Sequence, residues 1–393
     1  MTPTLARPLI VALAVSIAGA LPGFLFGAVA VAMRPELHFS IPSIGIGMAG
    51  FFAASALACP PCGRITERIG ATRAMRIAAL GAGVVLLAMA IVPHSFPPLV
   101  ALLVAGGLVQ GFSSPAVNMY MAQRISPARH GLAFGIKQAS IPGALLISGA
   151  SLPAIALTAG WRWVFVFGAA VAVVALALLW RRDPATGPGP AAAPDEARGA
   201  RRTGARWVAQ LSLAAGLASF APHSMGSFLV PTAIHDAGMA TGTAGILLAG
   251  GSVLALLSRL AVGEMADRTG LATLRPIGAM MAIGCGGLCA LALGSPAPLV
   301  VGTCLACAGG WGWASLFHLA VVRFNPQAPA AATGVAQAGI YWGAALAPLT
   351  FGVILDHSSY ATAWVVAAVV TAISVLIVFL ADAGRRASAV GRA

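Results

Sequence analysis

The chain has 393 residues, of which 59% are hydrophobic and only 8% are charged. Soluble globular proteins carry about 25% charged residues, so this composition excludes an ordinary soluble enzyme or binding domain. Apolar runs of about 18 residues or more recur along the whole chain and indicate a polytopic helical membrane protein. The net charge of +13 does not indicate nucleic-acid binding, because most basic residues lie in short breaks between the apolar runs.

Twelve apolar segments are long enough to cross a bilayer. An α-helix rises 1.5 Å per residue, so about twenty residues span a hydrocarbon core of about 30 Å. We therefore expect an all-α polytopic membrane protein with twelve transmembrane helices. The predicted spans cover residues 8–33, 43–62, 74–93, 97–123, 131–157, 161–181, 207–234, 241–262, 274–293, 297–322, 331–355 and 359–382.

The basic residues predict the orientation of these spans. If the N-terminus is cytoplasmic, the outer side carries only Arg34 and Arg162, and the other twenty arginines, Arg259 among them, lie on the cytoplasmic side. Positive residues concentrate on the cytoplasmic side of membrane proteins. We expect a multi-pass protein of the cell inner (plasma) membrane with both termini in the cytoplasm. We also expect a monomer that contacts membrane lipids and no nucleic acid.

The two halves of the chain are sequence repeats. At an offset of 200 residues Gly63 aligns with Gly263 and Arg68 with Arg268, and at an offset of 199 Gln138 aligns with Gln337. A stretch rich in Pro, Gly, Ala and Arg separates the halves and is typical of a flexible linker. We predict an N-terminal six-helix bundle over 1–181, a cytoplasmic linker over 182–206 and a C-terminal bundle over 207–393. Parallel repeats of this kind place a binding site at their interface, near the bilayer midplane.

The predicted cytoplasmic loop after span two contains a motif with a counterpart in the second half. It resembles the signature loop of the major facilitator superfamily, a glycine followed by an acid–arginine pair and a second glycine. The resemblance implies a secondary transporter that works by alternating access, with spans one, four, seven and ten lining a central cavity. It also implies gating roles, and the candidate gating residues are Gly63, Glu67, Arg68, Gly70, Arg73, Gly263, Asp267, Arg268 and Gly270.

Two departures separate the chain from the drug-efflux branch of that superfamily. Proton-linked exporters there have an arginine three residues before a Gln-Gly pair, but this chain has Gly107 before Gln110 and Gly111. The Gly-Pro-x-x-Gly-Gly pattern of drug antiporters is also missing from span five. The run from Gly135 to Ser140 instead resembles small bacterial permeases of the cyanate and organic-anion type. Drug or metabolite efflux by the same fold stays open as the alternative function.

Lys137 is the only lysine of the chain, and it lies inside a predicted span. A charge at the centre of a membrane helix costs about 2.5–3.5 kcal/mol on insertion scales, so it indicates a functional site. At the repeat offset its counterpart is Ala336, so the second half lacks this charge. Two alternatives are a structural or gating ion pair and a side chain that snorkels to the cytoplasmic interface.

Polar side chains at helical spacing predict the rest of the binding site. No carboxylate lies near the middle of a span, so a fixed cation among amides, hydroxyls and aromatic rings favours a small-molecule substrate that is anionic. Two histidines in the spans are candidates for coupling to a proton, the coupling ion that we consider. The candidate substrate-binding residues are Lys137, Asn118, Gln110, Gln138, Tyr341, His223, His318 and Trp311.

The sequence contains no constellation typical of an enzyme. It has no paired carboxylates within a span, no nucleophile with a neighbouring base and no phosphate-binding loop. We therefore expect a transporter without catalytic residues, cofactor or metal site. A membrane enzyme or a sensor is the alternative from another functional class.

Overall fold

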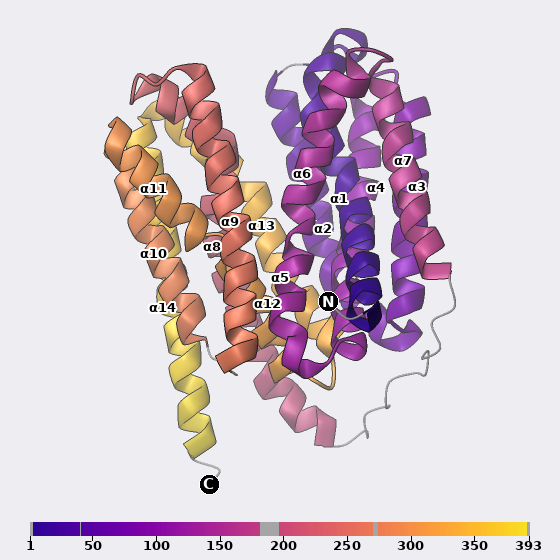
Figure 1. Ribbon diagram of the computed structural model, residues 1–393, viewed down its shortest axis with the longest axis vertical. Coiled ribbons are helices and arrows are strands. Elements are labelled where there is room, and N and C mark those ends of the chain that lie inside the picture. Colours follow the sequence, from indigo (N-terminus) through magenta and orange to yellow (C-terminus); the bar gives the residue numbers. More distant parts are fainter. Residues whose placement is uncertain (1–2, 40, 181–195, 270–273, 391–393) are drawn as a thin grey trace. The chain divides into compact units, whose positions relative to one another are not determined.

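The computed structural model describes residues 3–39, 41–180, 196–269 and 274–390, which form helices joined by short turns (Figure 1). Eleven helical stretches of these residues are long and apolar enough to cross a membrane, and Arg275–Leu291 is a shorter apolar helix. Each predicted span coincides with one of these twelve stretches. The described residues contain no strand. The prediction of a twelve-helix membrane fold is therefore confirmed.

The described chain forms two compact units. The first lies within Met1–Pro127, Ile136–Arg201 and Asn325–Ala338, and the second within Ala128–Gly135, Arg202–Phe324 and Gly339–Ala393. Each unit thus includes a short segment taken from the other half of the sequence. The bundle boundaries over 1–181 and 207–393 stay a prediction. Of the predicted linker, residues 182–195 lie outside the described residues, and a helix begins at Glu196.

The first unit is built around helix α1. This helix packs against α4, α6 and α7, while α2 lies along α4, and α3 lies along both α4 and α7. Apolar faces of these helices bury one another, which is the packing that a helix bundle requires. The bounds are α1 (Pro3–Leu37), α2 (Ile41–Ile69), α3 (Ala71–Ile91), α4 (Phe96–Arg124), α6 (Ser140–Ser151), the π-helix η2 (Leu152–Ala156) and α7 (Trp161–Trp180).

The predicted span 131–157 is not one continuous helix. The 3₁₀ turn η1 (Pro127–Arg129) leads into α5 (His130–Gln138), and the single residue Ala139 separates α5 from α6. Pro142 explains this break, because proline has no N–H and its ring clashes with the carbonyl four residues earlier, that of Gln138. Pro153 explains the π-helix in the same way, and the amide of Leu157 donates to the carbonyl of Leu152, five residues back.

Span 297–322 is also divided, at a run of glycines. Helix α11 (Pro296–Ala308) and helix α12 (Trp313–Phe324) are separated by turns that contain Gly309, Gly310 and Gly312. Glycine has a low helix propensity, and here it also permits close packing. A Cβ atom on Gly309 would lie 2.5 Å from the carbonyl oxygen of Met280.

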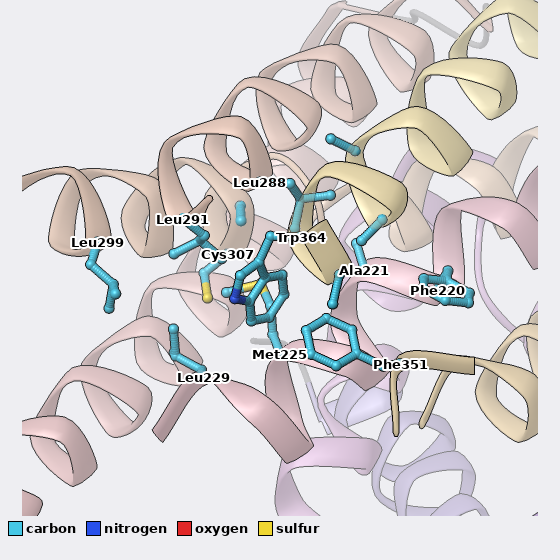
Figure 2. Packing of buried hydrophobic residues seen from close by; sticks show 14 of the residues in the cluster. Phe220, Ala221, Met225, Leu229, Leu288, Leu291, Leu299, Cys307, Phe351 and Trp364 are labelled. Carbon is cyan, nitrogen blue, oxygen red and sulfur yellow. The ribbon is translucent and has the colours of Figure 1, made fainter. Parts of the chain in front are cut away.

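The core of the second unit surrounds Trp364, which is fully buried. Figure 2 shows Phe351 and Met225 beside its ring, together with leucines from neighbouring helices. The ring centroids of Phe351 and Trp364 are 4.8 Å apart. The remaining helices of this unit are α8 (Glu196–His235), α9 (Thr241–Thr269), α10 (Arg275–Leu291), α13 (Pro329–His357) and α14 (Tyr360–Val390), of which α13 begins within the first unit.

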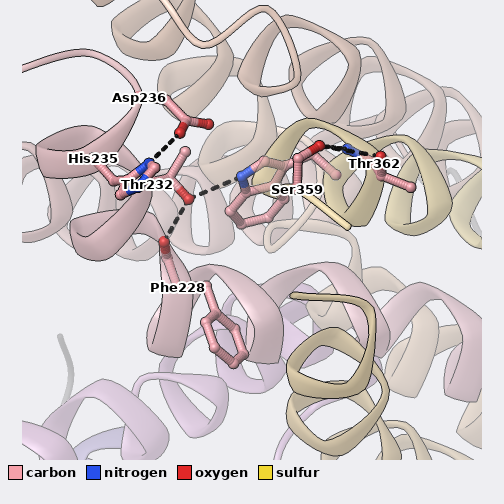
Figure 3. Close-up of polar contacts among 7 residues, drawn as sticks. Phe228, Thr232, His235, Asp236, Ser359 and Thr362 are labelled. Atoms are coloured by element: carbon pink, nitrogen blue, oxygen red, sulfur yellow. Dashed lines mark hydrogen bonds and ion pairs between the residues drawn. The ribbon is translucent and has the colours of Figure 1, made fainter. Parts of the chain in front are cut away.

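One hydroxyl group links this core to helix α8. The indole N–H of Trp364 donates to Thr232 Oγ1 over 3.0 Å, and the same hydroxyl donates to the carbonyl of Phe228 over 2.7 Å (Figure 3). A buried indole N–H normally requires a partner. Thr232 therefore fixes the position of α8, the helix that carries His223, relative to α14.

In the first unit, Glu36 joins α1 to α7. Its carboxylate accepts a hydrogen bond from the indole N–H of Trp161 at 2.7 Å and forms an ion pair with Arg162. Arg162 also donates to the carbonyl of Pro93 over 3.1 Å. The hydrogen bond from Trp161, followed by that from Arg162, lowers the pKa of Glu36 below its ordinary value of 4.5.

We expect Glu36→Gln to lower the melting temperature at neutral pH by about 1 °C, because this ion pair is partly exposed. A depressed carboxyl pKa contributes stability that is fully present above the unfolded pKa and is lost as pH falls through the folded pKa. The difference between the two proteins should therefore be constant from pH 6 to 8 and shrink below pH 4.5. Thermal unfolding in detergent over this pH range measures it, and a difference that grows on acidification contradicts the assignment.

Candidate functional site

Lys137 is buried in the first unit, with 6% of its surface exposed. Its Nζ donates to Ser114 Oγ on α4 at 3.4 Å and to Gln138 Oε1 at 3.3 Å. The Ser114 hydroxyl in turn donates to Gln337 Oε1 at 3.3 Å. The side chain thus extends toward α4, and its ammonium group does not snorkel to the aqueous interface. The two glutamines that align in the repeat are both part of this network.

The contacts of the ammonium group with Ser114 and Gln138 are long. Hydrogen bonds between an ammonium and a carboxylate are about 2.7–2.9 Å long and roughly twice as strong as neutral ones. At 3.3–3.4 Å, each of these two contacts with a neutral acceptor is weaker than a hydrogen bond between an ammonium and a carboxylate.

Asn118 and Gln110 lie on the same helix as Ser114. Asn118 is one turn further along α4 and is fully buried, and neither atom of its amide has a hydrogen-bond partner among the described residues. Gln110 is partly buried and packs against α1, because a Cβ on Gly19 would lie 2.6 Å from its Oε1. The structure thus places four of the predicted residues, Lys137, Gln138, Asn118 and Gln110, in the first unit.

The other four predicted residues lie in the second unit. His223 Nδ1 donates to the carbonyl of Ser219, and His318 Nδ1 donates to the carbonyl of Ala314, each over 2.8 Å. These bonds within one helix fix the ring orientation of both histidines. His318 and Tyr341 are buried, whereas Trp311 is half-buried.

Arg259 is a buried cation that the charge pattern does not distinguish from the exposed arginines. The pattern predicts it on the cytoplasmic side, and the structure shows that only 7% of its surface is exposed and that it lies within α9. Its Nε donates to the carbonyl of Trp311 over 3.1 Å, and its guanidinium lies 5.9 Å from the centre of the Trp311 ring. It therefore positions Trp311. Its place inside the apolar run before Gly263 was the available signal, and its repeat counterpart is the uncharged Cys59.

The acids of the two signature motifs cap helix N-termini. Glu67 Oε1 accepts hydrogen bonds from the amides of Ala330 at 2.6 Å and Ala331 at 3.2 Å, in the first turn of α13. The two carboxylate oxygens of Asp267 accept from the amides of Gly131 at 2.6 Å and Leu132 at 2.8 Å, in the first turn of α5. The first amides of a helix lack partners within the helix and carry partial positive charge, which a carboxylate compensates.

The glycines of the motifs have two different roles. Gly63 lies inside α2 and Gly263 inside α9, and both permit close packing. A Cβ on Gly63 would lie 2.5 Å from the carbonyl oxygen of Ala330, and one on Gly263 would lie 2.4 Å from that of Gly131. Of the motif glycines that the structure describes, Gly70 has a positive φ, +87°, a value that favours glycine.

The remaining gating candidates are exposed or lie outside the described part. Arg68 and Arg73 are exposed, and Arg268 pairs with Glu264 one turn away at 3.0 Å. Gly270 lies outside the described residues. Asp267 is 3.9 Å from Arg323. The acids therefore carry the helix contacts of this motif, and a gating role for the arginines stays a prediction.

Comparisons with known proteins identify the fold. The family model of the Major Facilitator Superfamily matches residues 11–336. The solved structure of the transporter FucP in the outward conformation is similar, with a TM-score of 0.72 and 15% identity, over 95% of this chain and 98% of that chain. The proton:xylose symporter XylE bound to 6-bromo-6-deoxy-D-glucose has a TM-score of 0.74 and 17% identity, over 95% of both chains. No curated protein matches the sequence.

We expect Glu67→Gln and Asp267→Asn each to lower the melting temperature, because a neutral amide accepts weaker hydrogen bonds than a carboxylate. The loss should be about 1 kcal/mol for each substitution. The two effects should add in the double variant, because the two acids share no partner. Thermal unfolding of the four proteins measures these effects.

Glu264→Gln is the matched control. Glu264 lies three residues before Asp267, and its ion pair with Arg268 is largely exposed. Such pairs contribute little to stability. An equal loss in Glu264→Gln would show that surface charge, rather than the cap of α5, sets the effect.

Proposed function

The chain belongs to the Major Facilitator Superfamily, and we propose that this secondary transporter moves a small organic anion across the cell inner membrane by alternating access. Lys137 supplies the positive charge that receives the anionic group of the substrate. Gln138, Asn118 and Gln110 orient the substrate by hydrogen bonds. Tyr341 and Trp311 of the second unit stay candidates for further substrate contacts.

The charges that the bundle buries support an anionic substrate. Among the described residues, Lys137 and Arg259 are buried inside spans. Asp382 of α14 is also buried and pairs with Arg386 at 2.9 Å and Arg275 at 3.4 Å, and the Asp267 side chain, 6% exposed, accepts from the first amides of α5. These carboxylates already face positive partners, so the buried cation Lys137 is the charge that favours an anionic substrate over a cationic one.

The long contacts around Lys137 are the observation that carries the proposal. Its ammonium meets Ser114 and Gln138 at 3.4 and 3.3 Å. A carboxylate that replaced these acceptors would form a shorter, charge-assisted bond without any new charge being buried in the protein. The cost of burying the lysine would then be recovered when substrate binds.

His223 and His318 are the groups that we assign to proton coupling. Histidine has a reference pKa near neutrality and can change charge during a transport cycle. In each ring Nδ1 is held by a backbone carbonyl, so Nε2 is the atom that would gain or lose the proton. Replacement of either histidine by glutamine should then abolish accumulation driven by a pH gradient but retain exchange.

We expect Lys137→Met to reduce uptake of the organic anion at least about 100-fold while the protein stays folded, because methionine keeps the apolar stem and removes the charge. The ratio of uptake of a carboxylate to that of its uncharged amide should fall to about one. Both quantities are measured with radiolabelled substrates in proteoliposomes, after a thermal-shift screen of an organic-anion panel has identified a ligand.

Ser140→Ala is the matched control, because Ser140 is a buried polar residue of the next helical turn and carries no charge. It should transport like the wild type. Uptake by Lys137→Met at the wild-type rate, particularly with resistance of the host cell to apolar drugs, would contradict the proposal and favour efflux.

A further inference from the structure

Asn118 is a buried amide that the protein itself does not satisfy. It has no exposed surface, and neither Oδ1 nor Nδ2 has a hydrogen-bond partner in the described part of the chain. Every residue of α4 from Ser113 to Met121 is buried, so this part of the helix has no side that faces solvent. The amide of Asn118 therefore cannot reach solvent by rotating its side chain. A buried polar group without a partner costs about 1–3 kcal/mol, so such a group requires an explanation.

The buried serines of the same unit show why Asn118 differs from them. Ser55 is equally buried, and its hydroxyl donates to the carbonyl of Phe51 in the preceding turn over 2.8 Å. Ser16 and Ser148 also have unpartnered hydroxyls, but rotation about one bond offers a serine the same bond within its helix. An asparagine side chain has a donor, Nδ2, and an acceptor, Oδ1, and both need a partner. A backbone carbonyl of the helix can accept from Nδ2 but cannot donate to Oδ1.

The position of Asn118 relates it to the anion-binding lysine. It lies four residues after Ser114, so the two side chains share one face of α4 about 6 Å apart along the axis. Ser114 Oγ accepts the bond from Lys137 Nζ. A substrate whose carboxylate replaced Ser114 at the ammonium would therefore extend along α4 toward the amide.

We infer that Asn118 recognises a second, uncharged group of the substrate, and that the substrate is an organic anion with a hydroxyl or primary amide about one helical turn from its carboxylate. A hydroxyl can donate to Oδ1 and accept from Nδ2, which satisfies both halves of the amide. This inference rests on the proposed function, because it takes Lys137 as the site of the carboxylate. It names the chemical class of anion that the transporter selects.

The test compares butanoate with 2-hydroxybutanoate, 3-hydroxybutanoate and 4-hydroxybutanoate. Binding to the purified full-length protein is measured by titration of its thermal stability. We expect the wild type to bind 4-hydroxybutanoate at least about tenfold more tightly than butanoate, because a site built for a hydrogen bond rejects the analogue that lacks it. The preference should decrease as the hydroxyl moves toward the carboxylate.

Asn118→Leu, which is similar in size and apolar, should reduce this ratio to about one. Ser55→Ala is the control and should leave the ratio unchanged. Asn118→Ser tests the same point if the leucine variant does not fold, and its ratio should lie between those of the wild type and of the leucine variant. A ratio within one variant does not depend on the amount of folded protein.

Two results would overturn the inference. One is a wild type that binds butanoate and its three hydroxy derivatives equally. The other is an Asn118→Leu variant that keeps the preference, which would mean that an internal water alone satisfies the amide. Failure of the proposed function gives a different result. In that case Lys137→Met leaves the preference for a carboxylate ligand over its uncharged amide analogue unchanged, whatever the result for Asn118→Leu.

Discussion

A charge inside a membrane span has to be solvated by the protein that carries it. This constraint explains the polar contacts inside the first unit. Lys137 obtains its solvation from Ser114 on α4 and from Gln138, its neighbour in the chain. Ser114 then depends on Gln337 for an acceptor. Three segments distant in sequence are thus tied to one ammonium group.

A comparison of equivalent positions in the two halves of the sequence distinguishes the contacts that both halves share from the side chains that differ. Glu67 and Asp267 cap the first turn of α13 and of α5 in the same way, and Gly63 and Gly263 permit equivalent close contacts. The buried cations do not follow this symmetry. Lys137 aligns with Ala336, and Arg259 aligns with Cys59. A symmetric backbone framework therefore carries asymmetric charges, and such asymmetry is what recognition of an asymmetric substrate requires.

The sequence predicted the features that depend on amino-acid composition and on the helical spacing of polar and apolar residues. Hydropathy located the twelve spans, because every backbone group in lipid must be bonded within a helix. Ser140, Ala144, Ser148 and Ser151 follow one another at helical spacing, and these are the buried residues of α6. The break beside Ala139 was missed, although Pro142 carries the signal, because hydropathy does not register a missing N–H.

Other features depend on contacts that no local pattern encodes. Arg259 lies four residues before Gly263, close enough to the end of its predicted span to be counted as cytoplasmic. Its burial depends on Trp311, which is 52 residues away in the chain. The partners of Glu67 are likewise amides 263 and 264 residues away. No local pattern around Glu67 identifies these two amides as its partners.

The break in span five lies at Gln138, the residue that also contacts the ammonium group of Lys137. Gln138 is the last residue of α5, and its carbonyl cannot accept a helical hydrogen bond from Pro142, which has no N–H. The residue that helps to hold the ammonium of Lys137 therefore ends the segment where the helix is easiest to bend. Under the proposed function, an anion that draws the ammonium away from Gln138 would act at this helix break, a connection that a continuous helix would not provide.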